Sequence, residues 1–408
     1  MVNVRRLILF CYNLSVCLLF LSFLEYFSPS QSLILSSLTW VSFVITSVIL
    51  VFTRIVSGNR FLYLVIFLYV VLVWVSAYVN LGFIKSLTSL AFSGILYFSI
   101  FLTANEVFFR FGRIALLTPV RYSYLAIIVL SVFVFLGFDA FAPSGKNDFY
   151  PVITTFSGVF RNQNTLGMMA ACSTMIFFHW AVIDSVGLKR IFLYSVFFVS
   201  LGFVVFTLSR ASYLLVCLSF FIYLTLSGGF VSKFKYVVVF SLGIVIVLLM
   251  YPDVYGGIVL RLNDGTLSQR DVIWMDAFHK FINNYLVGVG PGIYRYEVGD
   301  FSLSAHNAYL MQLVNLGILG FCAWFFIIIY YFFKSSYVNV FLKQDVDSRI
   351  FYSLFVGILA HQVFESSIFS IQHPMTITLF VCMLISSLSK GTQNAPTKSA
   401  IIRPLSTA

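Results

Sequence analysis

The chain has 408 residues, of which 60% are hydrophobic and only 10% are charged, and its mean hydropathy is +0.99. A soluble domain must cover its surface with polar side chains, so this composition excludes an ordinary soluble protein. In a soluble chain, the net charge of +11 would suggest nucleic-acid binding. Here the basic residues lie mainly in short segments between apolar runs, as membrane orientation requires, so we expect no nucleic-acid partner.

The cysteines and the N-terminus add little chemistry. All six cysteines lie inside apolar runs and none forms a CxxC pair, so neither a disulfide framework nor a metal site is predicted. The N-terminal sequence MVNVRRLILF is basic and then apolar, like the start of a signal peptide. No small-residue cleavage site follows it, so we interpret it as the first membrane helix.

Apolar runs of membrane-spanning length occupy most of the chain. A spanning helix needs about 20 apolar residues. In chain order the candidates are 7–27, 33–53, 61–79, 81–104, 122–142, 165–184, 191–209, 211–228, 236–251, 306–333, 350–371 and 373–389. We therefore predict an all-α polytopic membrane protein of about 12 transmembrane helices, forming a single domain over 1–390. The polar tail 391–408 is predicted to be disordered and cytoplasmic.

The distribution of basic residues predicts the orientation. If the N-terminus is cytoplasmic, most of the 25 Lys and Arg fall in segments that this topology places inside, and the C-terminus is cytoplasmic too. Two long loops, about 143–164 and 252–305, are then periplasmic. In the second loop, apolar residues between Ser268 and Tyr285 recur at helical spacing. This pattern predicts an amphipathic helix along the bilayer surface, ended by the turn-forming GVGPG at 288–292.

Of the arginines predicted on the outer side, where the positive-inside rule disfavours them, three are candidate site residues. Arg210 separates two apolar runs, Arg161 precedes a span, and Arg270 opens the predicted amphipathic helix. Each has a structural alternative. Arg210 could be a snorkelling anchor, Arg161 a solvated loop residue, and Arg270 part of a wet helix face.

Histidine and glutamate residues are also candidates for this face. His306 opens the tenth span, although a lone histidine there is more often a cap or a surface residue. His361 and Glu365 are four residues apart and could form a mutually satisfied pair, whereas His179 has no predicted partner. Guanidinium groups fit phosphate oxygens, and an imidazole can remove a proton from a hydroxyl. Their convergence predicts a site for a lipid-linked, phosphate-bearing substrate at the outer leaflet.

Several motifs resemble those of the O-antigen ligase and O-antigen polymerase superfamily. They are Arg210-x-x-x-Leu214, the pair His306-Asn307 followed after nine residues by Gly317-x-x-Gly320, the segment GVFRNQNTLG, and RDVIWMDAF with the later LVGVGPGIY. The resemblance covers about 155–325. The first five predicted spans share only their hydrophobicity with the family.

The resemblance implies a bacterial inner-membrane glycosyltransferase with a GT-C-like fold. It would transfer a glycan from undecaprenyl diphosphate to a hydroxyl in the periplasm, inverting the anomeric centre without a metal or other cofactor. The implied roles are diphosphate binding by Arg210, Arg270 and Arg161, and general base catalysis or acceptor orientation by His306. Supporting roles, as substrate contact or loop structure, would fall to Asn162, Asn164, Asn307 and Glu365.

The acceptor distinguishes the two family activities. A ligase uses the lipid A core and a polymerase uses another lipid-linked repeat. The R-x-x-x-W pattern of Arg270 and Trp274, with the FRNQN segment, favours a polymerase. Membrane lipid and a chain-length regulator are further expected partners. The main alternative, a flippase or transporter, predicts ionisable residues at mid-membrane depth and interrupted helices in two matching halves, whereas we expect the charges at one face. A non-catalytic scaffold would leave the arginines unexplained.

Overall fold

The computed structural model describes residues 2–24, 29–52, 60–138, 156–183, 186–227, 238, 241, 270–298, 301–341, 346–367 and 373–387. These residues are predominantly helical. The predicted span 236–251, apart from positions 238 and 241, lies outside the described residues. So do most of the loop 143–164, the first part of the loop 252–305, and the tail 391–408.

The elements follow one another as thirteen helical segments and one small hairpin within the described part of the chain. They are α1 (Val2–Ser22), α2 (Pro29–Phe52), α3 (Arg60–Ser89), the π-helical η1 (Leu90–Ile95), α4 (Leu96–Phe135), α5 (Gln163–Ile183), α6 (Leu188–Phe206), α7 (Arg210–Leu226), α10 (Arg270–Asn283), β1 (Tyr296–Val298), β2 (Phe301–Leu303), α11 (Ala308–Ser336), the π-helical η3 (Tyr337–Phe341), α12 (Val346–His361) and α13 (Pro374–Ser386). The two strands pair antiparallel, with Tyr296 opposite Leu303.

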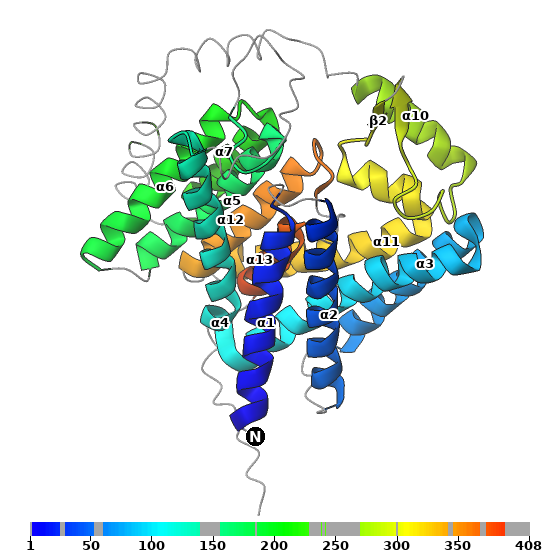
Figure 1. Cartoon of the computed structure of the whole chain (residues 1–408), viewed down its shortest axis with the longest axis horizontal. Coiled ribbons are helices and arrows are strands. Elements are labelled where there is room, and N and C mark those ends of the chain that lie inside the picture. Colours follow the sequence, from blue (N-terminus) through cyan, green and yellow to red (C-terminus); the bar gives the residue numbers. More distant parts are fainter. Residues whose placement is uncertain are drawn as a thin grey trace, which may run out of the picture.

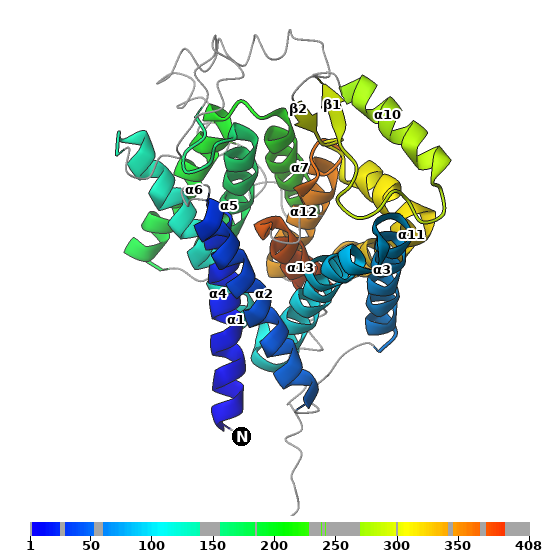
Figure 2. The ribbon, with the colours of Figure 1, turned by 45° about the vertical axis from the view of Figure 1, so that its right-hand side comes forward.

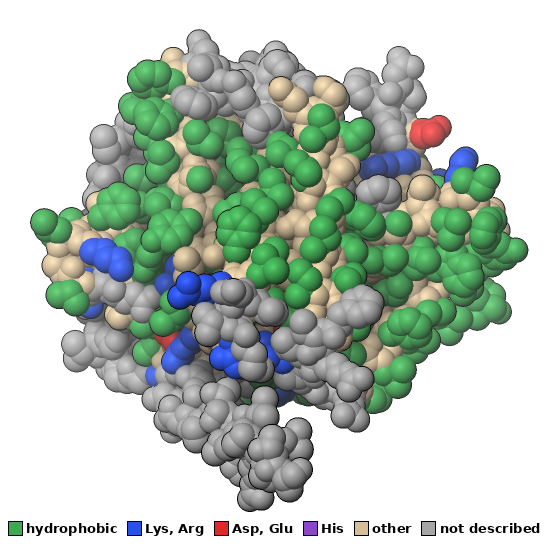
Figure 3. Space-filling view, turned by 60° about the horizontal axis from the view of Figure 1, so that its bottom comes forward, with side chains coloured by type: hydrophobic (Ala, Val, Ile, Leu, Met, Phe, Trp, Pro, Cys, Tyr) green, Lys and Arg blue, Asp and Glu red, His purple; other side chains and the backbone are tan. Residues whose placement is uncertain are grey.

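Seven of these helices are long and apolar enough to cross a membrane, and Arg210–Leu226 and Pro374–Ser386 are apolar but shorter. On the face shown in Figure 3, hydrophobic side chains cover much of the described surface, as lipid contact requires, while Lys and Arg gather in a few clusters. The chain is therefore an all-helical, multi-pass membrane protein. Seven helices of the described residues meet this criterion, and the predicted number of about twelve spans is not confirmed.

Part of this difference arises because three long helices are each broken at a glycine. Gly82 in α3, Gly112 in α4 and Gly317 in α11 have φ of 76°, 81° and 65°. A side chain would be strained in this left-handed region, which glycine enters without penalty. The predicted spans 61–79 and 81–104 meet at the break in α3. The loop predicted between 104 and 122 is helical, apart from the break at Gly112.

Helix α5 is the centre of the bundle, because every residue from Leu166 to Ala181 is buried. Glycines allow its neighbours to approach closely. A Cβ on Gly167 of α5 would lie 2.6 Å from Ser212 Oγ of α7, and a Cβ on Gly357 of α12 would overlap Ser219 of α7. These contacts hold α5, α7 and α12 together as a tightly packed group.

Helix α10 and the hairpin form a unit at the end of the molecule away from the N-terminus, with the hairpin between α10 and α12 (Figures 1 and 2). One face of α10 buries Ile273 and Ala277 against Val314 of α11. Val272 and Met275 are exposed on another side. Of the apolar residues on which the predicted amphipathic helix rested, Trp274 and Phe281 pack against this cluster, whereas Phe278, Ile282 and Tyr285 are exposed.

The break in α11 connects this unit to the bundle. At Gly317 the helix loses backbone hydrogen bonds, and the segment 285–290 that follows α10 replaces them. The bonds run from Val289 N to Val314 O (2.9 Å), from Gly290 N to Asn315 O (3.0 Å) and from Ile318 N to Tyr285 O (2.8 Å). A Cβ on Gly317 would overlap the backbone of Leu286. The glycine is thus required both by its φ and by this close approach.

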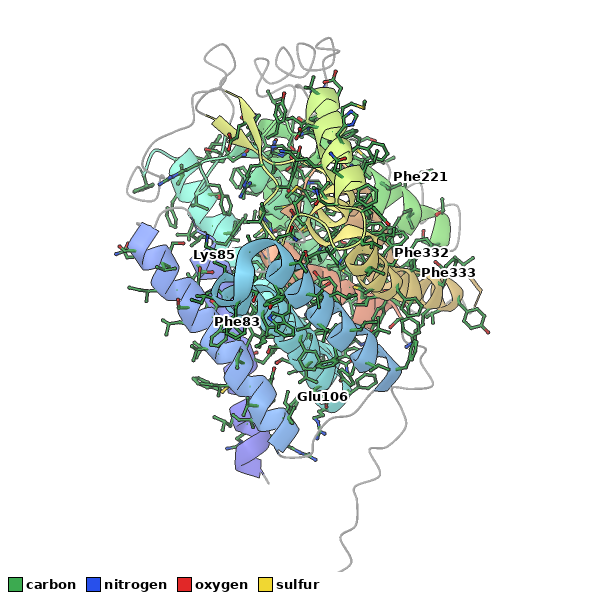
Figure 4. All side chains as sticks on the ribbon, turned by 90° about the vertical axis from the view of Figure 1, so that its right-hand side faces the viewer. Phe83, Lys85, Glu106, Phe221, Phe332 and Phe333 are labelled. Carbon is green, nitrogen blue, oxygen red and sulfur yellow. The ribbon has the colours of Figure 1, made fainter. Side chains whose placement is uncertain are left out.

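A group of ionisable side chains from α4, α5 and α12 is buried inside the bundle. Arg121 lies 3.0 Å from His179 Nδ1, and His179 Nε2 lies 3.0 Å from the Asp347 carboxylate, which also pairs with Arg113. The buried carboxylate Glu106 lies toward the end opposite α10 (Figure 4). The expectation that the charges lie at one face is therefore wrong. His179 also has partners, and Arg121 is a buried residue of α4 rather than a loop residue.

Replacing Gly317 with alanine tests the helix break. We expect Gly317→Ala to lower the melting temperature of the purified protein, because it adds backbone strain of about 1–3 kcal/mol and a clash with Leu286. Gly82→Ala is the matched control, since it has a similar φ but nothing within 4 Å of its Cβ. Equal melting temperatures for the two variants would contradict the proposed close approach.

Candidate active site

The candidate residues cluster where α5, α10 and α11 begin and where α12 ends. Glu365 follows the end of α12 by four residues and is only 15% exposed. Its carboxylate accepts a hydrogen bond from Asn164 Nδ2 at 3.3 Å and is hydrogen-bonded to His306 Nδ1 at 3.2 Å. It also lies 3.7 Å from the Arg270 guanidinium. One carboxylate therefore joins residues from three helix beginnings, at positions 164, 270 and 306 of the chain.

Backbone hydrogen bonds fix the position of this carboxylate. The amide of Ala308, the first residue of α11, donates to the carbonyls of Gln362 (2.9 Å) and Glu365 (3.1 Å). The first turn of α11 and the segment after α12 are thus held together independently of the side chains. His306, two residues before Ala308, is placed next to Glu365 as a result.

The surroundings of Glu365 favour its ionised form. Burial alone raises the pKa of a carboxyl group, but the hydrogen bond from His306 and the charges of His306, His361 and Arg270 outweigh it. The pKa of Glu365 is therefore held below its usual value. At neutral pH the carboxylate is ionised and can only accept hydrogen bonds.

His306 has a left-handed backbone with φ of 46°, which is strained for a residue with a side chain. Its neighbours hold this conformation. The Trp274 indole donates to the carbonyl of Ala305 at 2.7 Å, and the Asn307 side chain caps α11 by accepting from Leu310 N at 3.0 Å. The imidazole remains 32% exposed. The strain is concentrated at the residue whose side chain reaches Glu365.

The two asparagines at the start of α5 have different environments. The exposed side chain of Asn162 accepts a hydrogen bond from Asn164 N at 2.8 Å, so Asn162 caps the start of α5. Asn164 is half-buried and reaches Glu365. Arg161 is exposed immediately before this cap. The structure thus gives Asn162 a capping contact and brings Asn164 into the cluster.

Arg210 is the first residue of α7 and is exposed. Its neighbour Ser209 lies against Gly167, in the second turn of α5. Asn164, one turn earlier in α5, contacts Glu365. Arg210 therefore lies beside the beginning of α5, at the same end of the bundle as the Glu365 cluster.

These helix beginnings make the site suitable for an anion. The N-terminus of a helix carries unpaired N–H groups and a partial positive charge, which favour phosphate. Here α5, α7, α10 and α11 begin close together, and Arg161, Arg210 and Arg270 lie at or next to those starts. Glu365 provides one negative charge against these three. Within the described residues, no group of three or more His, Cys, Asp or Glu side chains is arranged to hold a metal ion.

The pairing of His361 with Glu365, which the sequence left open, does not form as a hydrogen bond between the two side chains. His361 is fully buried and its Nδ1 lies 3.1 Å from the side chain of Gln362, while Glu365 bonds to residues of other helices. The two are not on consecutive helical turns, because α12 ends at His361. The supporting role of Trp274 was missed as well. The R-x-x-x-W spacing pointed to this residue, but only the fold brings its indole to Ala305.

Comparison with known protein families matches part of the chain. Residues 195–325 match the family model described as O-Antigen ligase, and this region contains Arg210, Arg270 and His306 but not Asn164 or Glu365. No curated protein matches the chain at a significant level. The matched family implies a glycosyltransferase-like enzyme activity. This region, about a third of the chain, is similar to the O-antigen ligase family, which supports the superfamily that the motifs indicated.

Proposed function

We propose that the protein transfers a glycan from undecaprenyl diphosphate to a sugar hydroxyl during assembly of a surface polysaccharide. The transfer takes place at the periplasmic face of the bacterial inner membrane, with both termini of the protein in the cytoplasm. The observation that supports this proposal is the His306–Glu365 pair, which lies where four helices begin and where Arg270 is also bound.

The arginines and the helix beginnings bind the diphosphate of the donor. Arg210 and Arg270 hold its oxygens, and Arg161 adds a third positive charge at the edge of the site. When the bond to the sugar breaks, negative charge grows on the diphosphate, and fixed positive groups stabilise that charge. This arrangement supplies the electrostatic stabilisation from the chain's own residues and partial helix charges.

His306 acts as the general base. Because the ionised Glu365 can only accept, the hydrogen on the imidazole lies on Nδ1 and the lone pair on Nε2. Nε2 removes the proton from the acceptor hydroxyl as its oxygen attacks the anomeric carbon. The bond between that carbon and the diphosphate oxygen breaks, its electron pair leaves with undecaprenyl diphosphate, and the configuration inverts. Glu365 stabilises the imidazolium that forms.

The acceptor determines whether the protein is a polymerase or a ligase. The Arg270–Trp274 spacing and the FRNQN segment favour a repeat-unit polymerase, while the matching family model is described by its ligase activity. A deletion strain distinguishes them on a polysaccharide gel. Core with a single repeat unit indicates a lost polymerase. Core alone, with long glycan still on the carrier lipid, indicates a lost ligase.

The buried Arg121–His179–Asp347 group raises the alternative of transport. Its members bond to one another, as in a structural network. Asn164 and His179 are fifteen residues apart on α5, or about 22 Å at the rise of an α-helix. No described ion pair connects the network to Glu365. These features support a separate packing role for the network and a transfer reaction at the other end.

Variants of the proposed dyad test the mechanism. We expect His306→Ala to lower kcat by about 10²–10⁴-fold, the usual contribution of a general base. Glu365→Gln should also lower kcat, because the amide cannot stabilise the imidazolium. Turnover with a purified lipid-linked donor measures both. His279→Ala, exposed on α10, is the control. Unchanged turnover of His306→Ala with normal polysaccharide ladders would refute the assignment.

Variants of Arg210 test diphosphate binding. Arg210→Ala should reduce kcat/KM by about 10²-fold or more, since it removes a charged group that stabilises the leaving diphosphate. Arg210→Lys keeps the charge but loses the planar fork, so we expect an intermediate activity. The same measurement is repeated with donors whose leaving groups differ in pKa. If both variants keep the wild-type kcat/KM with all of these donors, Arg210 does not contact the diphosphate.

Chelation of divalent metal ions tests which positive groups neutralise the leaving diphosphate. Because three arginines and several helix beginnings neutralise the leaving group in this proposal, we expect turnover to persist in excess EDTA. The measurement compares initial rates before and after chelation, with Mg²⁺ or Mn²⁺ added back. Loss of turnover that a divalent ion restores would argue for a metal-assisted reaction instead.

A further inference from the structure

A polar cleft lies between α10 and the β1–β2 hairpin, outside the Glu365 cluster. It has a volume of about 500 Å³, and its walls are formed by Asp276, Lys280, Ile293, Arg295, Tyr296 and Glu297. This volume falls within the range of small-molecule sites, roughly 300–1,000 Å³. Five of the six side chains carry polar atoms, so the cleft is suited to a ligand rich in hydrogen-bonding groups.

The α10 wall of the cleft is held in place by its own contacts. Lys280 Nζ lies 3.3 Å from the Asp276 carboxylate and 3.4 Å from the carbonyl of Arg295, and it sits over the Tyr294 ring. The Tyr294 hydroxyl donates to Asp276 at 3.1 Å. These contacts tie the helix to the hairpin, so the wall is fixed before any ligand binds. Fixed polar groups lower the entropic cost of binding.

The hairpin wall presents charged side chains to solvent. Arg295, directly before β1, and Glu297, within β1, are both exposed. Neither side chain forms an ion pair with a described residue. Two acidic and two basic side chains line the cleft, and their formal charges cancel. A polyphosphate would be repelled by the carboxylates, whereas neutral sugar hydroxyls can pair with both kinds of group.

Both walls lead directly to the candidate active site. Asp276 follows Arg270 by six residues, which is about 9 Å along α10. On the other wall, β2 ends at Leu303, three residues before His306. A glycan whose reacting sugar lies at His306 would therefore have this cleft within reach of its more distant sugars.

We propose that the cleft is a saccharide subsite, which binds the glycan beyond its reacting sugar and adds affinity without taking part in the chemistry. This proposal rests on the proposed function, because that function brings glycan to this face. The glycan could belong to the lipid-linked donor or to the acceptor chain. Both present the same hydroxyl chemistry to Arg295 and Glu297.

Binding of free oligosaccharide tests the subsite without turnover. The probe is the repeat-unit oligosaccharide released by mild acid from the strain's own surface polysaccharide, and saturation-transfer NMR measures its binding to the full-length protein in nanodiscs. We expect Arg295→Ala and Glu297→Gln each to raise Kd by about tenfold, the factor typical of a lost hydrogen bond to a charged group. His279→Ala, exposed on α10 outside the cleft, should bind as wild type does.

The outcomes separate this proposal from the proposed function. Wild-type protein that does not bind the oligosaccharide, or cleft variants that bind it as well as wild type, would overturn the subsite. His306→Ala should keep the affinity and lose turnover. If it keeps both, the proposed mechanism fails while the subsite stands. In turnover, a higher KM for the acceptor alone places the acceptor glycan in the cleft, and a higher KM for the donor alone places the donor there.

Discussion

A carboxylate that is mostly withdrawn from water needs compensating partners, and Glu365 finds them on three other helices. An unpaired buried charge would be costly, so the contacts from Asn164, Arg270 and His306 must form together if the fold is to hold the group. The same contacts fix the spacing of the helix beginnings around it. The geometry of the candidate site thus follows from satisfying this one charge.

The arrangement also depends on how the unit of α10 and the β1–β2 hairpin is fixed to the bundle. A helix that simply rested on the membrane surface could slide relative to the spans. Here the break at Gly317 exposes backbone groups of α11, and the segment 285–290 satisfies them. Backbone hydrogen bonds have a defined register, so α10 cannot shift without losing several of them. Arg270 is therefore delivered to a defined position, which a diphosphate site requires.

The charges divide the molecule into two ends with different tasks. Around His179 and Asp347, opposite charges and an imidazole bond to one another inside the bundle. Near Glu365, three arginines lie at or next to helix beginnings, and Asp271 adds a second carboxylate in the first turn of α10. The buried helix α5 contributes His179 to the first group and Asn164 to the second. The first arrangement holds helices together, and the second supports the proposed binding of a diphosphate.

The sequence by itself determined the membrane class and the family motifs, because apolar runs and short motifs are local properties. It also predicted a helix around Trp274, although not which side is covered. Only the tertiary structure decided that Glu365 joins His306 rather than His361, that long helices break at glycines, and that a buried ionic network lies inside the bundle. These features depend on contacts between residues far apart in the chain, and a helical or charge pattern read along the sequence contains no information about which helices meet.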